Sequence, residues 1–148
     1  MAMWGGRFQE ASLDEFRAFN DSLAFDYLLA QQDIAASRSW AIGLAEAGII
    51  TAEEAALLDG ALAELATEVE ANPELPLQTK EEDIHSWVEA KLGEKIGHAA
   101  KKLHTGRSRN DLVATDLRLW SKLNAGLVRD ALQSAIGALL TFARSHYG

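Results

Sequence analysis

Apolar positions along the chain recur at intervals of three and four residues, the spacing of helices that pack one face against a core. The clearest case begins at Thr51 and Glu54, whose types and spacing predict a capping box at a helix start. The apolar stripe that follows consists of Ala55, Leu58, Leu62, Leu65 and Val69. Asn72 and Pro73 end the pattern, because proline cannot continue a helix.

Two further helices are predicted in the first half of the chain. Ser12 and Glu15 form a second predicted capping box, ahead of two phenylalanines on one face. A longer helix is expected from near residue 25 to residue 47, with Gly48 as its stop.

A break and a fourth helix follow. The two prolines of the chain, Pro73 and Pro76, lie in a predicted loop of about ten residues. The acids at residues 81–83 then favour a helix N-terminus, because the free N–H groups there carry partial positive charge. The inward face of this helix is expected to carry Ile84, Val88 and Leu92.

The last predicted helix is long. From about Asn110 to His146 the sequence contains no proline, and its apolar positions include Val113, Leu117, Leu127, Ile136 and Leu140. At 1.5 Å per residue this helix would extend roughly 55 Å, whereas a compact domain of this mass has a radius of gyration of about 15 Å. We therefore expect it to project beyond the core. No segment has a strand pattern, so the predicted class is all-α.

Composition narrows the range of functions. The chain has 148 residues, 48% of them hydrophobic, which is enough for one domain with a core. Its formal net charge of -8 argues against nucleic acid as a partner. The chain lacks cysteine, which excludes disulfides and thiolate metal sites. Neither a signal peptide nor a membrane-spanning run is evident, so we expect a cytoplasmic protein that does not bind membranes.

One stretch, KKLHTGRSRND at residues 101–111, is basic although the protein is acidic. It precedes the long helix, whose first N–H groups lack partners within the helix. Arg107 and Arg109 offer planar donors that match carboxylates, and Ser108 and Asn110 can cap the helix or bind a ligand. The stretch indicates either an anion site, most plausibly for carboxylates, or an ordinary cap with solvated arginines. The order of residues in a phosphate-binding P-loop is absent.

A second candidate is EEDIHSW at residues 81–87. Asp83 and His85 are two positions apart and would pair only if the backbone were still turning there. In that case Asp83 would orient the imidazole and raise its pKa. The alternative is a helix-terminal acid beside a surface histidine. No His or carboxylate spacing in the sequence suggests a metal site, and none is expected.

A third candidate is WGGRF at residues 4–8, where two glycines permit close approach of the backbone. Arg7 would then reach an acid or a partner subunit. The segment is equally compatible with a mobile N-terminus.

These motifs occur in an informative order. WGGRF, FNDS at residues 19–22, EDIH at 82–85 and KLHTGRSRND followed by VATDLRLW together resemble the argininosuccinate lyases of the fumarase/aspartase superfamily. TGRSRND is the most specific of them, since fumarases and aspartases typically have a serine-serine-asparagine version. One position departs from the family: Leu112 stands where glutamine is usual. If the polar contact of that glutamine exists in this protein, Leu112→Gln should be tolerated or mildly beneficial.

The resemblance implies a cofactor-free β-elimination of argininosuccinate to arginine and fumarate. It implies that Ser22, Ser108, Arg109 and Asn110 contact substrate, with Arg7, Thr105 and Arg107 as further candidates. By the same resemblance Asp83 and His85 support the site, and no residue of this chain is the catalytic acid or base.

The resemblance also implies a longer protein that assembles as a homotetramer. Members of the family have later active-site segments, a serine-rich mobile loop and a second histidine, that are absent here. We therefore expect an N-terminal piece that is inactive alone. Its helical domain would span residues 1–109, and residues 110–148 would begin the first long helix of a central bundle. Two alternatives remain: a structural protein of the same family, as in lens crystallins, and a small anion- or RNA-binding helical module.

Overall fold

The computed structural model describes residues 14–147, and every regular element among them is helical. The predicted all-α class is therefore confirmed for the described residues. In chain order, the elements are the helices α1 (Asp14–Asn20) and α2 (Leu23–Asp26), a 3-10 turn (Tyr27–Leu29), α3 (Ala30–Glu46), α4 (Ala52–Ala71), a second 3-10 turn (Leu75–Gln78), α5 (Ile84–Ile96), a 3-10 segment (Gly97–His104) and α6 (Arg109–His146).

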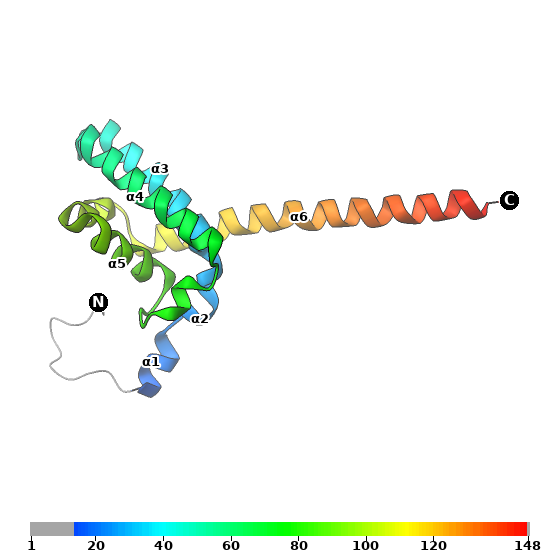
Figure 1. The fold of residues 1–148 in the computed structure, drawn as a ribbon, viewed down its shortest axis with the longest axis horizontal. Helices are drawn as coiled ribbons and strands as arrows, with labels where there is room; N and C mark the ends of the chain where they lie inside the picture. Colours follow the sequence, from blue (N-terminus) through cyan, green and yellow to red (C-terminus); the bar gives the residue numbers. More distant parts are fainter. Residues whose placement is uncertain (1–13, 148) are drawn as a thin grey trace.

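Helices α3 and α4 form an antiparallel pair that lies along one side of the N-terminal part (Figure 1). Gly48, with φ of +70°, makes the turn between them in a conformation that glycine adopts without strain. The predicted capping box is confirmed, since Thr51 Oγ1 accepts from the Glu54 N–H at 3.2 Å and Glu54 Oε2 accepts from the Thr51 N–H at 3.1 Å.

The predicted helix from residue 25 to residue 47 is in fact subdivided. The backbone keeps right-handed helical angles from Ser22 to Ala30, but it tightens into a 3-10 turn before α3 begins. The loop after α4 likewise contains a 3-10 turn, with Pro76 in its first turn.

One hydrophobic core joins α3, α4, α5 and the 3-10 segment before α6. Trp87 on α5 is its largest fully buried side chain. Most of the predicted inward residues are buried, and Ala55 is partly buried: the buried ones are Leu58, Leu62, Leu65, Val69, Ile84, Val88 and Leu92. The 3.6-residue pattern therefore identified the packed faces of α4 and α5 correctly.

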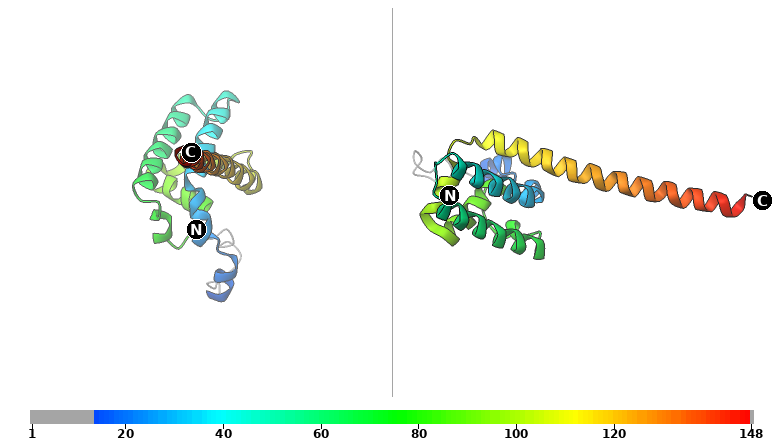
Figure 2. Two further views of the ribbon diagram at one scale, coloured as in Figure 1. Left: turned by 90° about the vertical axis from the view of Figure 1, so that its right-hand side faces the viewer. Right: turned by 90° about the horizontal axis from the view of Figure 1, so that it is seen from above.

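Helix α6 has 38 residues, about 57 Å at 1.5 Å per residue, and only its first turns touch the rest of the molecule. Figures 1 and 2 show it leaving the N-terminal helices and extending alone. Leu112 and Asp116 are its only buried residues in the described chain. The predicted long projecting helix is thus confirmed. No helix among the described residues is long and apolar enough to cross a membrane.

Two sequence predictions fall outside the described residues. The capping box of Ser12 and Glu15 depends on Ser12, and the WGGRF interpretation depends on Arg7, and both of these residues precede residue 14.

Candidate functional site

The start of α5 is held by two carboxylates. Asp83 is the N-cap, and its Oδ1 accepts from the Ser86 N–H at 2.7 Å. Asp26, from α2, accepts from the Ile84 N–H at 3.0 Å. The Ser22 hydroxyl donates to the other oxygen of Asp26 at 2.6 Å. Two of the N–H groups that a helix start leaves free are thereby satisfied.

Ser22 also reaches this place through its backbone. Its N–H donates to the carbonyl of Glu82 at 2.8 Å, next to Asp83. Ser22 and Asp83, 61 positions apart in the sequence, are therefore neighbours in the fold.

Arg109, the first residue of α6, completes the group. Its guanidinium donates to both carboxylate oxygens of Asp83 and to Ser86 Oγ, the latter at 3.2 Å. The two side chains are only 19% and 16% exposed. Burial by itself would raise the pKa of Asp83, but the Ser86 N–H and the Arg109 guanidinium outweigh it and hold this pKa below its usual value. Asp83 is therefore a paired carboxylate, and Arg109 is a fixed donor rather than a solvated cation.

Ser108 caps α6. Its hydroxyl oxygen accepts from the Asn110 N–H at 2.9 Å, and Asp111 accepts from the Ser108 N–H at 3.3 Å. The hydroxyl proton of Ser108 is left to donate elsewhere. The side chain of Asn110 is exposed beside it. For Ser108 the structure thus favours the cap, one of the two interpretations of the sequence.

The loop before α6 rests on α3. Gly106 has φ of +71° and lies against Trp40, whose indole N–H donates to the carbonyl of Thr105 at 3.2 Å. The guanidinium of Arg107 lies 6.0 Å from the centre of the Trp40 ring, at the outer limit of a cation–π contact. Trp40 therefore supports the loop in its turn.

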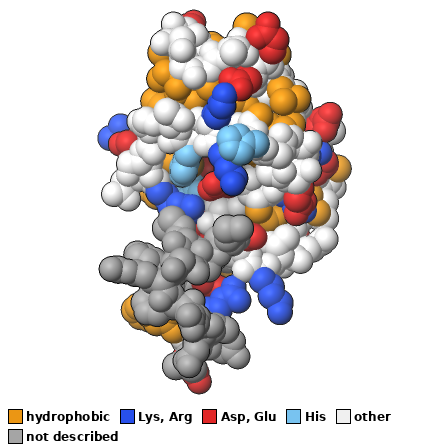
Figure 3. Space-filling model, turned by 90° about the vertical axis from the view of Figure 1, so that its left-hand side faces the viewer, with side chains coloured by type: hydrophobic (Ala, Val, Ile, Leu, Met, Phe, Trp, Pro, Cys, Tyr) orange, Lys and Arg blue, Asp and Glu red, His pale blue; other side chains and the backbone are white. Residues whose placement is uncertain are grey.

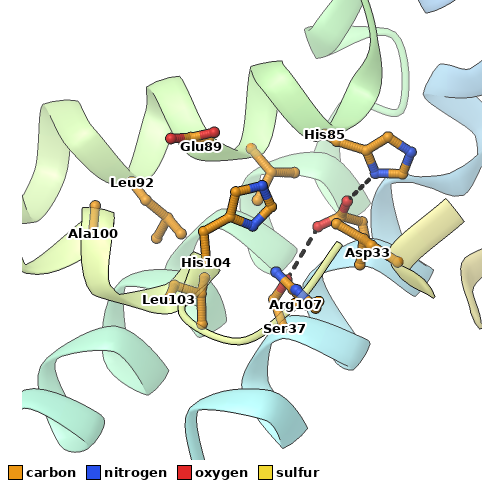
Figure 4. Close-up of a pocket in the computed structure, with 11 residues that line it drawn as sticks. Asp33, Ser37, His85, Glu89, Leu92, Ala100, Leu103, His104 and Arg107 are labelled. Atoms are coloured by element: carbon orange, nitrogen blue, oxygen red, sulfur yellow. Dashed lines mark hydrogen bonds and ion pairs between the residues drawn. The ribbon is translucent and has the colours of Figure 1, made fainter. Parts of the chain in front are cut away.

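His85 does not pair with Asp83, and that interpretation was wrong. Its Nδ1 lies 2.6 Å from Asp33 Oδ2 and 3.6 Å from Asp116 Oδ2, so Asp33 on α3 is its hydrogen-bond partner. The alternative of a surface histidine is wrong as well, because the side chain is only 5% exposed. Side chains two positions apart on one helix point in different directions. Asp83 therefore faces Arg109, whereas His85 faces α3 and α6. Figure 4 shows His85 and Asp33 at one end of a cleft, with His104 near its middle and Leu92, Ala100 and Leu103 toward its other end.

The charged groups of this buried cluster shift one another's pKa values. Burial opposes the charge of His85, but the hydrogen bond to Asp33 and the charges of Asp33, Asp83 and Asp116 raise its pKa above the usual value. Burial and the charge of Asp33 raise the pKa of Asp116 to about 7. Neither oxygen of Asp116 accepts a hydrogen bond from a described residue, whereas the protonated acid can donate to Asp33. The proton of this cluster is therefore held jointly.

The same three side chains also lie close enough to ligate a metal ion, with one atom of each within 4.8 Å of the others. No ligand spacing in the sequence indicates this cluster, because Asp33, His85 and Asp116 lie far apart along the chain. The distances suit a proton better, however. Two atoms bound to one Zn²⁺ at about 2.0–2.2 Å are separated by roughly 3 Å or more, whereas His85 Nδ1 and Asp33 Oδ2 are 2.6 Å apart, a hydrogen-bond distance.

The basic stretch is largely neutralised within the chain. Lys102 pairs with Glu54 at 2.5 Å, Arg109 with Asp83, and Arg107 faces the charges of Asp33 and Asp116. Figure 3 shows one face of the molecule on which histidines adjoin both Lys or Arg and Asp or Glu side chains.

Leu112, the departure from the resembled family, is 3% exposed and lines the cleft beside Arg107. Because a glutamine here would bury an amide, the expectation that Leu112→Gln is tolerated does not fit this position.

The structure groups the predicted site residues in two places. Ser22, Asp83 and Arg109 meet at the start of α5, with Ser108 and Asn110 following at the start of α6. His85 and Arg107 belong to the buried cluster, and Thr105 meets Trp40. Four further members of these groups were not predicted: Asp26, Asp33, Trp40 and Asp116. Only Asp33 and Asp116 could have been noticed in the sequence, because each is an acid within an apolar helical stripe.

A protein-family model described as lyase matches residues 6–146. The chain belongs to this lyase family of the fumarase/aspartase superfamily. The match includes both groups of side chains and all of α6.

Proposed function

We propose that this chain is the first part of an argininosuccinate lyase, which splits argininosuccinate into arginine and fumarate in arginine biosynthesis. Membership of the lyase family supports the type of reaction. The observation that supports the substrate is the TGRSRND segment, whose Arg109 begins α6 and pairs with Asp83, the neighbour of Ser22 in the fold.

The reaction is a β-elimination. A base removes the proton from the carbon beside a carboxylate, and negative charge spreads into that carboxylate. The bond between the neighbouring carbon and the guanidino nitrogen then breaks, and an acid protonates that nitrogen. Fixed hydrogen-bond donors facing the developing charge lower the barrier of such a step.

The start of α6 supplies donors of this kind. The first-turn N–H groups, the Ser108 hydroxyl and the exposed Asn110 amide lie together there, and Arg109 is fixed beside them by Asp83. We assign Ser22, Ser108, Arg109 and Asn110 to substrate binding. Asp83 and His85 support the site. We place the base and the acid in other segments of a longer protein, and the reaction needs no cofactor.

The surface of α6 supports assembly. Between Leu123 and His146 only Arg129, Asp130 and Arg144 belong to the charged residue types. Large apolar side chains point in most directions: Leu123, Leu127, Val128, Leu132, Ile136, Leu139, Leu140 and Phe142 are all more than half exposed. A helix that is apolar nearly all round is normally buried among other helices. We infer that α6 packs against long helices of further segments and subunits, in a homotetramer of the cytoplasm.

Two substitutions in the complete protein test the proposal. Asn110→Ala removes a proposed hydrogen bond to substrate charge, which contributes about 1.5–3 kcal/mol, so we expect the rate of argininosuccinate cleavage to fall roughly ten- to a hundredfold. Arg129→Ala, on the exposed part of α6, is the control and should have little effect on this rate. Equal, small effects at both positions would reduce the TGRSRND segment to a helix cap. Residues 1–148 alone should be inactive.

A further inference from the structure

The candidate site and the buried cluster share the first turn of α5. Asp83 and His85 lie two positions apart: Asp83 holds Arg109, and His85 bonds Asp33. A shift of this turn would therefore move both groups together.

The two groups also share the loop before α6. Arg109 pairs with Asp83, while Arg107, two positions earlier, faces the buried cluster. Both terminal nitrogens of Arg107 donate to Ser37 Oγ at 3.4 Å, and Ser37 donates to Asp33 at 3.3 Å (Figure 4). The loop is thus supported by contacts to both groups.

The charges within the cluster depend on one proton. Asp33 and Asp116 are 1% and 0% exposed. Two ionised carboxylates so deeply buried destabilise the fold unless cations beside them offset their charge. Above about pH 7, where Asp116 is ionised, a protonated His85 and Arg107 supply two positive charges, which balance those of Asp33 and Asp116. With a neutral His85, one negative charge would stay unbalanced in the interior, and that is unfavourable.

We propose that His85 is a positioning residue: its proton, held against Asp33 and Asp116, keeps the segment from Thr105 to Arg109 in place, and its loss at alkaline pH loosens that segment. The effect on catalysis rests on the proposed lyase function. The loosening itself is a property of the fold and is testable without substrate.

The charged groups on the elements around His85 either favour or oppose its protonation. The acids that act on His85 are Asp26 on α2, Asp33 on α3, Asp83 at the start of α5 and Asp116 on α6. Glu89, His104 and Arg107 line the same cleft. The four acids favour the proton, and Arg107 and burial oppose it. Because the pKa of His85 is raised, its stabilising contribution is complete below the ordinary histidine pKa and is lost as pH rises through the raised value.

The first measurement is NMR of the protein with ¹⁵N-labelled histidine. His85→Gln identifies the His85 signal among the four histidines. We expect this ring to stay doubly protonated to higher pH than an ordinary histidine. Asp33→Asn should lower the pH at which it titrates.

The second measurement is amide hydrogen exchange in residues 105–112, expressed relative to amides of α4 in the same sample. The relative exchange should rise in the wild type as His85 loses its proton, and it should be raised at all pH values in Asp33→Asn. His104→Gln is the matched control, because His104 lines the same cleft without bonding a carboxylate among the described residues. It should leave the pH dependence unchanged.

Two results would overturn the proposal. One is a His85 ring that titrates at or below the ordinary histidine pKa. The other is relative exchange in residues 105–112 that does not change across the wild-type titration, a result that does not depend on the folding of any variant.

Kinetics separate this proposal from the proposed function. In the active protein, His85→Gln should lower kcat by up to roughly a hundredfold, because a displacement of about 1 Å in the substrate-positioning groups has an effect of that size, and it should shift the alkaline limb of the pH profile. Should the wild type lack argininosuccinate lyase activity, the proposed function fails, whereas the titration and exchange results still decide the role of His85.

Discussion

The partly buried pair of Arg109 and Asp83 joins the two segments of the candidate site, and a double-mutant cycle measures its strength. Asp83→Asn removes the charge but keeps a good N-cap residue. Arg109→Met removes the other charge and keeps an unbranched stem of similar packing. Each single variant leaves one partner unpaired, and the double variant leaves neither.

The expected magnitude follows from burial. Breaking a fully buried pair typically destabilises by about 3–5 kcal/mol, and exposed pairs contribute far less because water screens them. With side chains 19% and 16% exposed, we expect each single variant to lose about 1–3 kcal/mol. The coupling free energy should be about 1–2 kcal/mol.

Urea unfolding followed by tryptophan fluorescence is the assay, since Trp87 is completely buried and its environment changes on unfolding. The matched control is the cycle Arg38→Met and Asp59→Asn, another Arg–Asp pair of this chain with both side chains 43% exposed. Its coupling should be close to the limit of measurement. Additive effects at Arg109 and Asp83 would show that the pair does not join the two segments.

Three more predictions concern other parts of the molecule. Leu112→Gln should destabilise by about 1–3 kcal/mol in urea unfolding, because it buries an amide at a site 3% exposed; unchanged stability would mean that the site admits water. Asp116→Asn should flatten the pH dependence of stability between about pH 4 and 7. In this window the folded wild type retains the Asp116 proton, which the unfolded chain loses near 3.8. The stability of the wild type therefore falls as pH rises, by at most about 4 kcal/mol for a pKa of about 7. Leu127→Glu with Ile136→Glu should lower the association state in sedimentation, while the urea unfolding of the N-terminal helices stays unchanged; unaltered sedimentation would place the interface elsewhere.

Local signals in the sequence predicted the elements well. The capping box at Thr51 and the stripe from Leu58 to Val69 depend on neighbours within one or two turns, and both are present in the structure. Helix α6 was also predictable from local sequence, because its long run of residues contains no proline that would end a helix.

The partners of the site residues were not predictable in this way. One of the two interpretations paired Asp83 with His85 because they are close in sequence, yet each pairs with a residue from another element, Arg109 or Asp33. Such contacts depend on how α3, α5 and α6 pack, which a local pattern does not specify. An acid within an apolar stripe, as at Asp116, indicates a buried charge but not its partner.

The most direct measurement is a substrate comparison with the complete protein. Purified enzyme is incubated separately with argininosuccinate, aspartate and malate, and fumarate and the second product are quantified. We predict equal amounts of arginine and fumarate from argininosuccinate, and no fumarate above background from the other two. Fumarate from aspartate or malate, with none from argininosuccinate, would keep the protein in its lyase family but contradict the substrate assigned here.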